Sequence, residues 1–181
     1  MKTDPKWAEA ASDFAKYGIA PICTAVVALF VARFTQSHQK LQDRLRRKED
    51  FLERFLECSD ELQDRVEEAL KILVAFESSR INPQAQAALP ILQAQLRDTL
   101  RIVDESERKI SVYESKFKLF GFSDGLEAYR KHQLLTTTLK TLILQCLQGN
   151  APMNMVAVAR EHFWDSKRTL VTKLTTIFEK L

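Results

Sequence analysis

Glycine, proline and cysteine are all scarce in this chain of 181 residues. It contains four glycines and five prolines, where average usage predicts about twelve glycines. This shortage argues against β-sandwiches, glycine-rich nucleotide-binding folds and disordered tails, and it favours long helices. The three cysteines, Cys23, Cys58 and Cys146, lie far apart and include no Cys-x-x-Cys pair. Neither a disulfide framework nor a zinc module is therefore expected.

Sequence patterns that indicate catalysis or cofactor binding are also missing. The chain has no Glu-x-x-His pair for a di-metal site, and no Walker, Rossmann or Gly-x-Ser-x-Gly pattern. The basic run at 44–48 is followed at once by two acids and has no aromatic stacking platform, which argues against nucleic-acid binding. We therefore expect no enzyme activity, no cofactor, no metal and no nucleic acid, and no small-molecule substrate is evident.

An uncharged run of sixteen residues lies between Lys16 and Arg33. As a helix it is about 24 Å long, and aromatic residues at both ends extend it toward the interfaces of a bilayer. The alternatives are a buried core helix and a cleaved signal peptide, although a signal peptide has its positive charge before the apolar run. The pattern favours a single transmembrane helix at 18–34, preceded by a short interfacial segment at 1–17.

Basic residues are divided unequally between the two flanks of this run. Residues 1–16 contain three, whereas residues 33–48 contain six. The positive-inside rule then places the C-terminal part in the cytoplasm and the N-terminus outside, in an inner (plasma) membrane. The basic residues of the second flank are also expected to contact anionic lipid headgroups: Arg33, Lys40, Arg44, Arg46, Arg47 and Lys48.

Small residues recur at intervals of four along the predicted transmembrane helix. They are Ala20, Thr24, Ala28 and Ala32. Such a stripe lets two helices approach closely in lipid, so it predicts packing against a second copy or a partner helix. The alternative is that alanine is simply common in such helices.

The remaining residues, 35–181, are predicted to form an elongated antiparallel four-helix domain with coiled-coil-like seams. Apolar residues recur with 4-3 spacing, and glycines and prolines fall between the periodic runs, close to the expected N-caps Asn82 and Asn150. Short loops make consecutive helices antiparallel. Pro90 marks either a kink or the true start of its helix. The expected helices lie at about 35–80, 84–120, 124–148 and 152–180.

Charge is segregated along the first of these helices. Residues 49–79 contain ten acidic and three basic residues. Two interpretations remain open: a solvated helix face, or a surface that docks against bases of the fourth helix (Lys167, Arg168, Lys173) or of another subunit. The residues of this acidic face are Glu53, Glu57, Asp60, Glu61, Asp64 and Glu68.

Aromatic and lysine residues alternate at the end of the second helix, over 116–122. They suit a contact with the membrane interface. Alternatively, Phe117 and Phe120 belong to the seam, which leaves Leu119 and Phe122 to be explained.

These observations predict an all-α protein with one transmembrane helix and a cytoplasmic bundle. We expect it to act without enzyme activity, by assembly: as a homo-oligomer, or as a small subunit of an inner-membrane complex, in contact with membrane lipid. The alternative is a membrane-perturbing, toxin-like effector whose cytoplasmic bundle gates clustered transmembrane helices.

Overall fold

The computed structural model describes the backbone of residues 20–180 and the side chains of residues 25–180. Every secondary-structure element in this part is a helix, so the predicted all-α class is confirmed. The chain divides into two compact units, one ending at Arg47 and the other beginning at Lys48. Among its described residues the first unit contains the N-terminal part of α2, whereas the second contains the helical bundle.

Helix α2 extends from Ala20 to Ile81. Its length follows from the sequence, because no glycine or proline occurs between residues 22 and 82 to interrupt it. Asn82 follows, and its side-chain oxygen accepts a hydrogen bond of 3.1 Å from the backbone N–H of Gln84. Asn82 is therefore an N-cap, as predicted, of the 3-10 helix η2 (Pro83–Ala88).

The range predicted as one helix, 84–120, contains three elements. After η2 comes α3 (Leu89–Ser111), with Pro90 in its first turn, where the missing N–H costs little. Pro90 thus marks the true start of the helix rather than a kink. A turn at Val112 separates α3 from α4 (Tyr113–Phe120).

Each of the next two connections contains a glycine in the left-handed backbone conformation. Gly121 has φ 75°, and the N–H of Phe122 donates 2.9 Å to the carbonyl of Phe117, which closes the end of α4. Helix α5 (Ser123–Leu147) follows, and Gly149, with φ 77°, lies between it and α6 (Met153–Phe178). The prediction of Asn150 as an N-cap is wrong, because Pro152 occupies that position.

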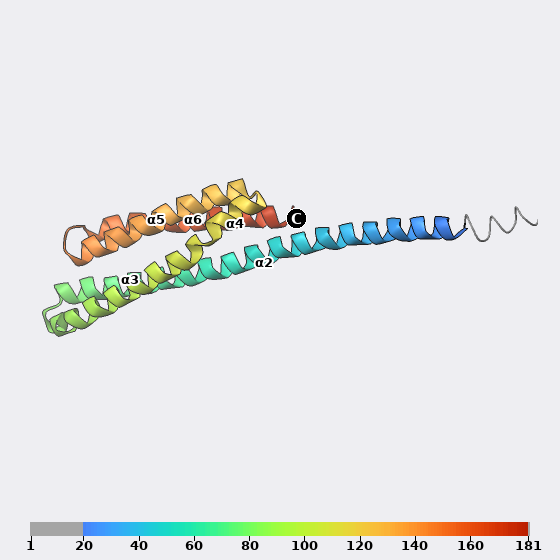
Figure 1. Cartoon of the computed structure of the whole chain (residues 1–181). Coiled ribbons are helices and arrows are strands. Elements are labelled where there is room, and N and C mark those ends of the chain that lie inside the picture. The colour runs from blue at the N-terminus through green and yellow to red at the C-terminus, as the bar shows by residue number, and fades with distance from the viewer. Residues whose placement is uncertain (1–19, 181) are drawn as a thin grey trace, which may run out of the picture. The chain divides into compact units, whose positions relative to one another are not determined.

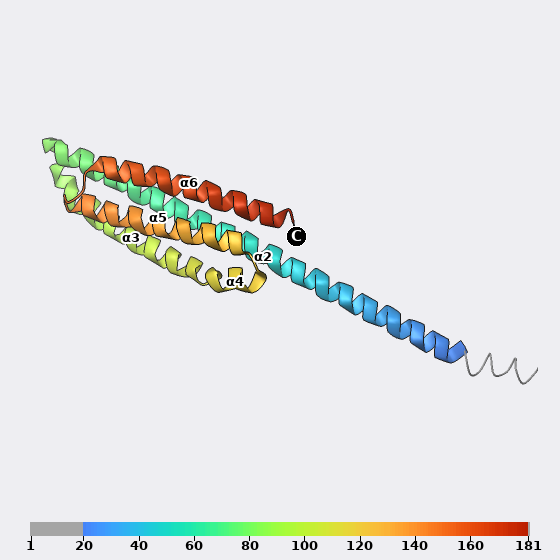
Figure 2. The same cartoon turned by 90° about the horizontal axis from the view of Figure 1, so that it is seen from above.

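Within the second unit, α3, α5, α6 and the C-terminal part of α2 lie side by side (Figures 1 and 2). Their apolar residues face a common core. The seam predicted for α2 starts at Leu41, which is 54% exposed, but from Leu52 onward all its positions are buried: Leu52, Phe55, Ser59, Leu62, Val66, Ala69, Leu73 and Phe76. The largest fully buried side chains come from all four helices and from α4: Phe55, Leu73, Leu96, Phe117, Leu139, Phe163 and Leu170.

Aromatic rings form a cluster where α2, α4 and α5 meet. The ring of Phe117 lies 4.9 Å from that of Phe55 and 5.8 Å from that of Tyr129, centroid to centroid. Phe122 is also buried and lies 6.1 Å from Phe51, so packing explains it without a membrane contact. Of the two residues left unexplained by the seam, only Leu119 remains exposed, at 78%.

Within the described residues, no helix combines the length and the apolar character needed to cross a membrane. The predicted interfacial segment, 1–17, lies outside these residues. The predicted transmembrane helix, 18–34, lies partly outside them, since the side chains of residues 20–24 are not described either.

Candidate functional site

The N-terminal part of α2 exposes large apolar side chains. Phe30 is 77% exposed and Leu29 is 70% exposed, and the other large apolar residues of this segment are at least half exposed. Of the predicted small-residue stripe, Ala28 and Ala32 are exposed, whereas the side chains of Ala20 and Thr24 lie outside the described part. The exposed large residues here are Val26, Val27, Leu29, Phe30, Val31 and Phe34.

The predicted headgroup-binding residues follow this apolar segment on the same helix. Five of them have exposed side chains: Arg33, Lys40, Arg44, Arg46 and Arg47. Lys48 differs, because it is half-buried and its ammonium lies 5.4 Å from the centroid of the Phe122 ring. A cation–π contact therefore engages Lys48 in the packing of the second unit.

The six residues of the acidic face are all exposed, but half of them already have partners within the chain. Asp60 accepts a hydrogen bond of 2.7 Å from Lys167 of α6. Glu61 lies 3.5 Å from the Lys109 ammonium of α3. In addition, Glu68 pairs with Arg65 one turn away on α2. Among the described residues, the carboxylates of Glu53, Glu57 and Asp64 have no ion-pair partner within 4.0 Å.

A buried polar cluster lies inside the bundle, and the sequence pointed to only two of its members, Asp60 and Lys167, as a possible docking pair. Lys167 is 4% exposed, and its ammonium donates 2.6 Å to the hydroxyl of Ser59 as well as to Asp60. Burial lowers the pKa of Lys167, and the Asp60 carboxylate partly opposes that shift. One signal was available, because residue 167 falls between Phe163 and Leu170 on the apolar face of its helix.

His132 of α5 belongs to the same cluster and contacts α6. Its Nδ1 lies 2.8 Å from the hydroxyl of Ser166, and that hydroxyl donates 2.7 Å to the carbonyl of Phe163. Because the Ser166 hydroxyl has a single proton and the Phe163 carbonyl accepts it, we assign the imidazole proton to Nδ1, which donates to Ser166. Burial, assisted by the charge of Lys167, lowers the pKa of His132 to about 4, so the ring is neutral near pH 7.

An ion-pair group connects α3 to α5 beside this cluster. The ammonium of Lys140 lies 2.5 Å from carboxylate oxygens of both Asp104 and Glu107. Burial lowers the pKa of Lys140, but the hydrogen bonds to the two carboxylates outweigh it, so the net shift is upward. Lys140 is therefore a cation held between two helices.

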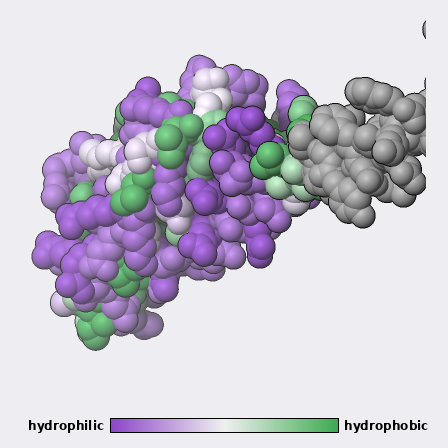
Figure 3. Space-filling view, turned by 45° about the vertical axis from the view of Figure 1, so that its right-hand side comes forward, coloured by the Kyte–Doolittle hydropathy of each residue, from purple (hydrophilic) through white to green (hydrophobic). Residues whose placement is uncertain are grey.

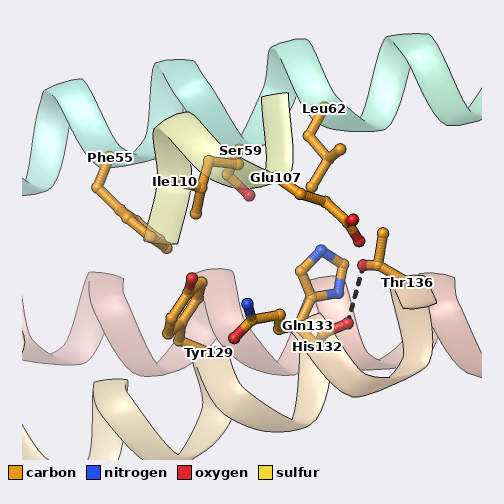
Figure 4. A pocket seen from close by; sticks show the side chains of 9 residues that line it. All are labelled: Phe55, Ser59, Leu62, Glu107, Ile110, Tyr129, His132, Gln133 and Thr136. Atoms are coloured by element: carbon orange, nitrogen blue, oxygen red, sulfur yellow. Dashed lines mark hydrogen bonds between the residues drawn. The ribbon is translucent and has the colours of Figure 1, made fainter. Parts of the chain in front are cut away.

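A small cavity lies next to the cluster and is lined by side chains of α2, α3 and α5 (Figure 4). Its volume is about 10 Å³. A serine hydrogen-bonded to a lysine can act as a nucleophile in other settings, but Ser59 is buried and this cavity is too small for an organic substrate. The geometry favours a role for the cluster in holding the helices in register.

The outer surface of the bundle has open grooves between its helices. One lies between α2 and α6 beside Val74 and Met153, and another lies between α5 and α6 beside Leu142 and Val158. The face in Figure 3 is mainly hydrophilic, with hydrophobic surface in small separate areas. In the described part of the chain, no group of three or more His, Cys, Asp or Glu residues has the arrangement of a metal site.

Comparison of the chain with protein-family models, with curated proteins and with solved structures finds no match. The structure thus brings together few of the residues that the sequence singled out. Asp60 and Lys167 meet, whereas the basic residues 33–47 and the stripe residues Ala28 and Ala32 stay exposed on one helix.

Proposed function

We propose that this protein has no enzyme activity and acts by assembly while anchored to an inner (plasma) membrane through the N-terminal part of α2. The observation that carries the proposal is the group of exposed apolar side chains between Val26 and Phe34. Exposed apolar surface of this kind is unfavourable in water and favourable in a bilayer or a protein interface. The bundle remains in the cytoplasm.

The charge that follows the apolar segment supports this proposal. Six basic residues and one acidic residue lie between Arg33 and Lys48, and five of the six basic side chains are exposed. Near an anionic membrane surface each contributes about 1 kcal/mol of attraction. The same bias supports the orientation with the N-terminus outside.

Membrane attachment is tested by fractionation of cells that express the full chain. The protein should sediment with membranes, resist extraction at alkaline pH and be released by detergent. Changing Val27→Asp and Phe30→Asp together should move most of it to the soluble fraction. Leu119→Asp is the control, because Leu119 is as exposed as Phe30 but lies on the bundle. Equal membrane retention of the double variant and the wild type would refute the anchor.

Assembly is tested by native mass spectrometry of the complex extracted gently from its membranes. Multiples of the 20.8 kDa chain mass indicate a homo-oligomer, and additional foreign masses indicate a subunit of a larger complex. Changing Ala28→Leu and Ala32→Leu together should reduce assembly if this face forms the contact, because larger side chains prevent close helix approach. A monomer alone would refute the assembly proposal.

A further inference from the structure

Polar atoms that lack partners are concentrated at the small cavity inside the bundle. Among the described residues, four buried side-chain polar atoms have no hydrogen-bond partner. Three of these atoms belong to residues that line this one cavity: Glu107 Oε1, Tyr129 OH and His132 Nε2. Figure 4 shows these side chains around the same space, with Glu107 on α3 and the other two on α5.

None of the polar groups that line the cavity satisfies these atoms: three of them bond elsewhere, and the Gln133 amide, which also lines it, bonds to none of the three atoms. The hydroxyl of Thr136 donates 2.9 Å to the backbone carbonyl of His132 (the dashed line in Figure 4). Ser59 accepts from Lys167, and the other carboxylate oxygen of Glu107 accepts from Lys140. A buried polar atom without a partner costs about 1–3 kcal/mol, so three at one place need an explanation.

The chemistry of the three atoms defines what would satisfy them. His132 is neutral near pH 7 and carries its proton on Nδ1, so its Nε2 is an acceptor. Glu107 Oε1 is a second acceptor. Burial, together with the charges of Glu114 and Glu107, raises the pKa of Tyr129 to about 12, so its hydroxyl keeps its proton and is a donor.

We propose that this cavity is a buried water site. Water bound there donates to His132 Nε2 and Glu107 Oε1 and accepts from the Tyr129 hydroxyl. The volume of about 10 Å³ is close to what one water molecule needs, and it excludes organic ligands. An ammonium ion has a suitable size but has no lone pair to accept from Tyr129. The site connects α3 to α5 and explains why Glu107 and His132 face an apolar core.

The direct test is a high-resolution crystal structure of the full-length protein. We expect solvent density within hydrogen-bond distance of His132 Nε2, with no protein group bonded to that atom. Density that shows His132 Nε2 bonded directly to Glu107 or Tyr129, or a cavity without density, would overturn the proposal.

Water magnetic relaxation dispersion provides a second test in solution, because it counts water molecules that exchange slowly. The variant carrying Glu107→Leu and His132→Leu removes both acceptors and should lose the signal of about one water molecule. Tyr113→Phe is the matched control, since its hydroxyl contacts Cys58 outside the cavity, and it should leave the signal unchanged. An unchanged signal in a folded double variant would refute the site. If the double variant does not fold, the crystal structure of the wild type decides.

Discussion

Two ionisable side chains, Lys167 and His132, lie in the core of the bundle, and their surroundings favour different charge states. Burial lowers the pKa of Lys167, whereas the hydrogen bonds that Asp60 and Ser59 accept from its ammonium favour the charged form. His132 remains neutral because burial and the charge of Lys167 both oppose its protonation. The charge of Lys167 thus helps to keep His132 neutral, and both residues can be tested by substitution.

Removing the Asp60 carboxylate should leave the buried ammonium of Lys167 without an ionic partner. We expect Asp60→Asn to lower the free energy of unfolding by about 1–3 kcal/mol in urea titrations. Glu57→Gln, on an exposed acid without an ion pair among the described residues, is the control and should have little effect. Adding Lys167→Met to Asp60→Asn should recover part of the loss, because the buried charge is then gone. A double variant less stable than Asp60→Asn would contradict this explanation.

The neutral state of His132 predicts how stability depends on pH. Its pKa is lowered from an ordinary value of 6.5 to about 4, so the unfolded chain takes up the proton first. The contribution of His132 to the free energy of unfolding is therefore complete above about pH 6.5. As the pH falls toward 4, the free energy of unfolding decreases by about 3 kcal/mol in total. His132→Gln should flatten the pH dependence of the unfolding free energy in this window. His162→Gln, at an exposed histidine, should preserve it; equal slopes in the two variants would contradict the prediction.

At the scale of elements, α4 brings together parts of the chain that are distant in sequence. It presents Phe117 to Phe55 of α2 and Tyr129 of α5. The fit is close, since a Cβ added at Gly125 would lie 3.0 Å from a ring carbon of Phe117. The short helix therefore closes one end of the core.

Truncation of the central ring should show how much stability this closure contributes. Phe117→Ala should lower the free energy of unfolding by about 3–5 kcal/mol, because it removes a fully buried ring and leaves a cavity. Leu119→Ala is the control on the same helix, and its exposed side chain should contribute less than about 0.5 kcal/mol. Similar losses in the two variants, measured by denaturant titration, would mean that α4 does not close the core.

At the scale of the whole molecule, the buried core belongs to the unit that begins at Lys48. Each fully buried side chain lies between Leu52 and Leu174, and the N-terminal part of α2 contributes none in the described residues. The bundle is therefore complete without the apolar segment.

This division predicts that a fragment comprising residues 48–181 folds by itself. We expect far-UV circular dichroism of a helical protein and a single cooperative unfolding transition with a midpoint close to that of the full chain. A shorter fragment that begins at residue 59 lacks Phe51, Leu52 and Phe55, and it should lose cooperative unfolding. If the longer fragment also unfolds without cooperativity, then the N-terminal residues are part of the folding unit.

The sequence by itself determined the helical class, the buried seam from Leu52 onward and most helix ends within the bundle. Local rules decide these features: 4-3 spacing of apolar residues, the absence of glycine and proline from long runs, and the cap at Asn82 all act within a few residues. The choice between a kink and a start at Pro90 was left open, because both fit the same local pattern.

Only the tertiary structure decided how the polar residues are used. Ser59 and Lys167 are separated by 108 positions yet form a bond of 2.6 Å, and no local pattern predicts such a pair. The sequence suggested that Phe122 contacts the membrane interface. It is buried instead, because a turn at Gly121 directs it toward Phe51. The cavity beside His132 likewise depends on three helices meeting, since its size and its unpaired atoms arise only from their packing.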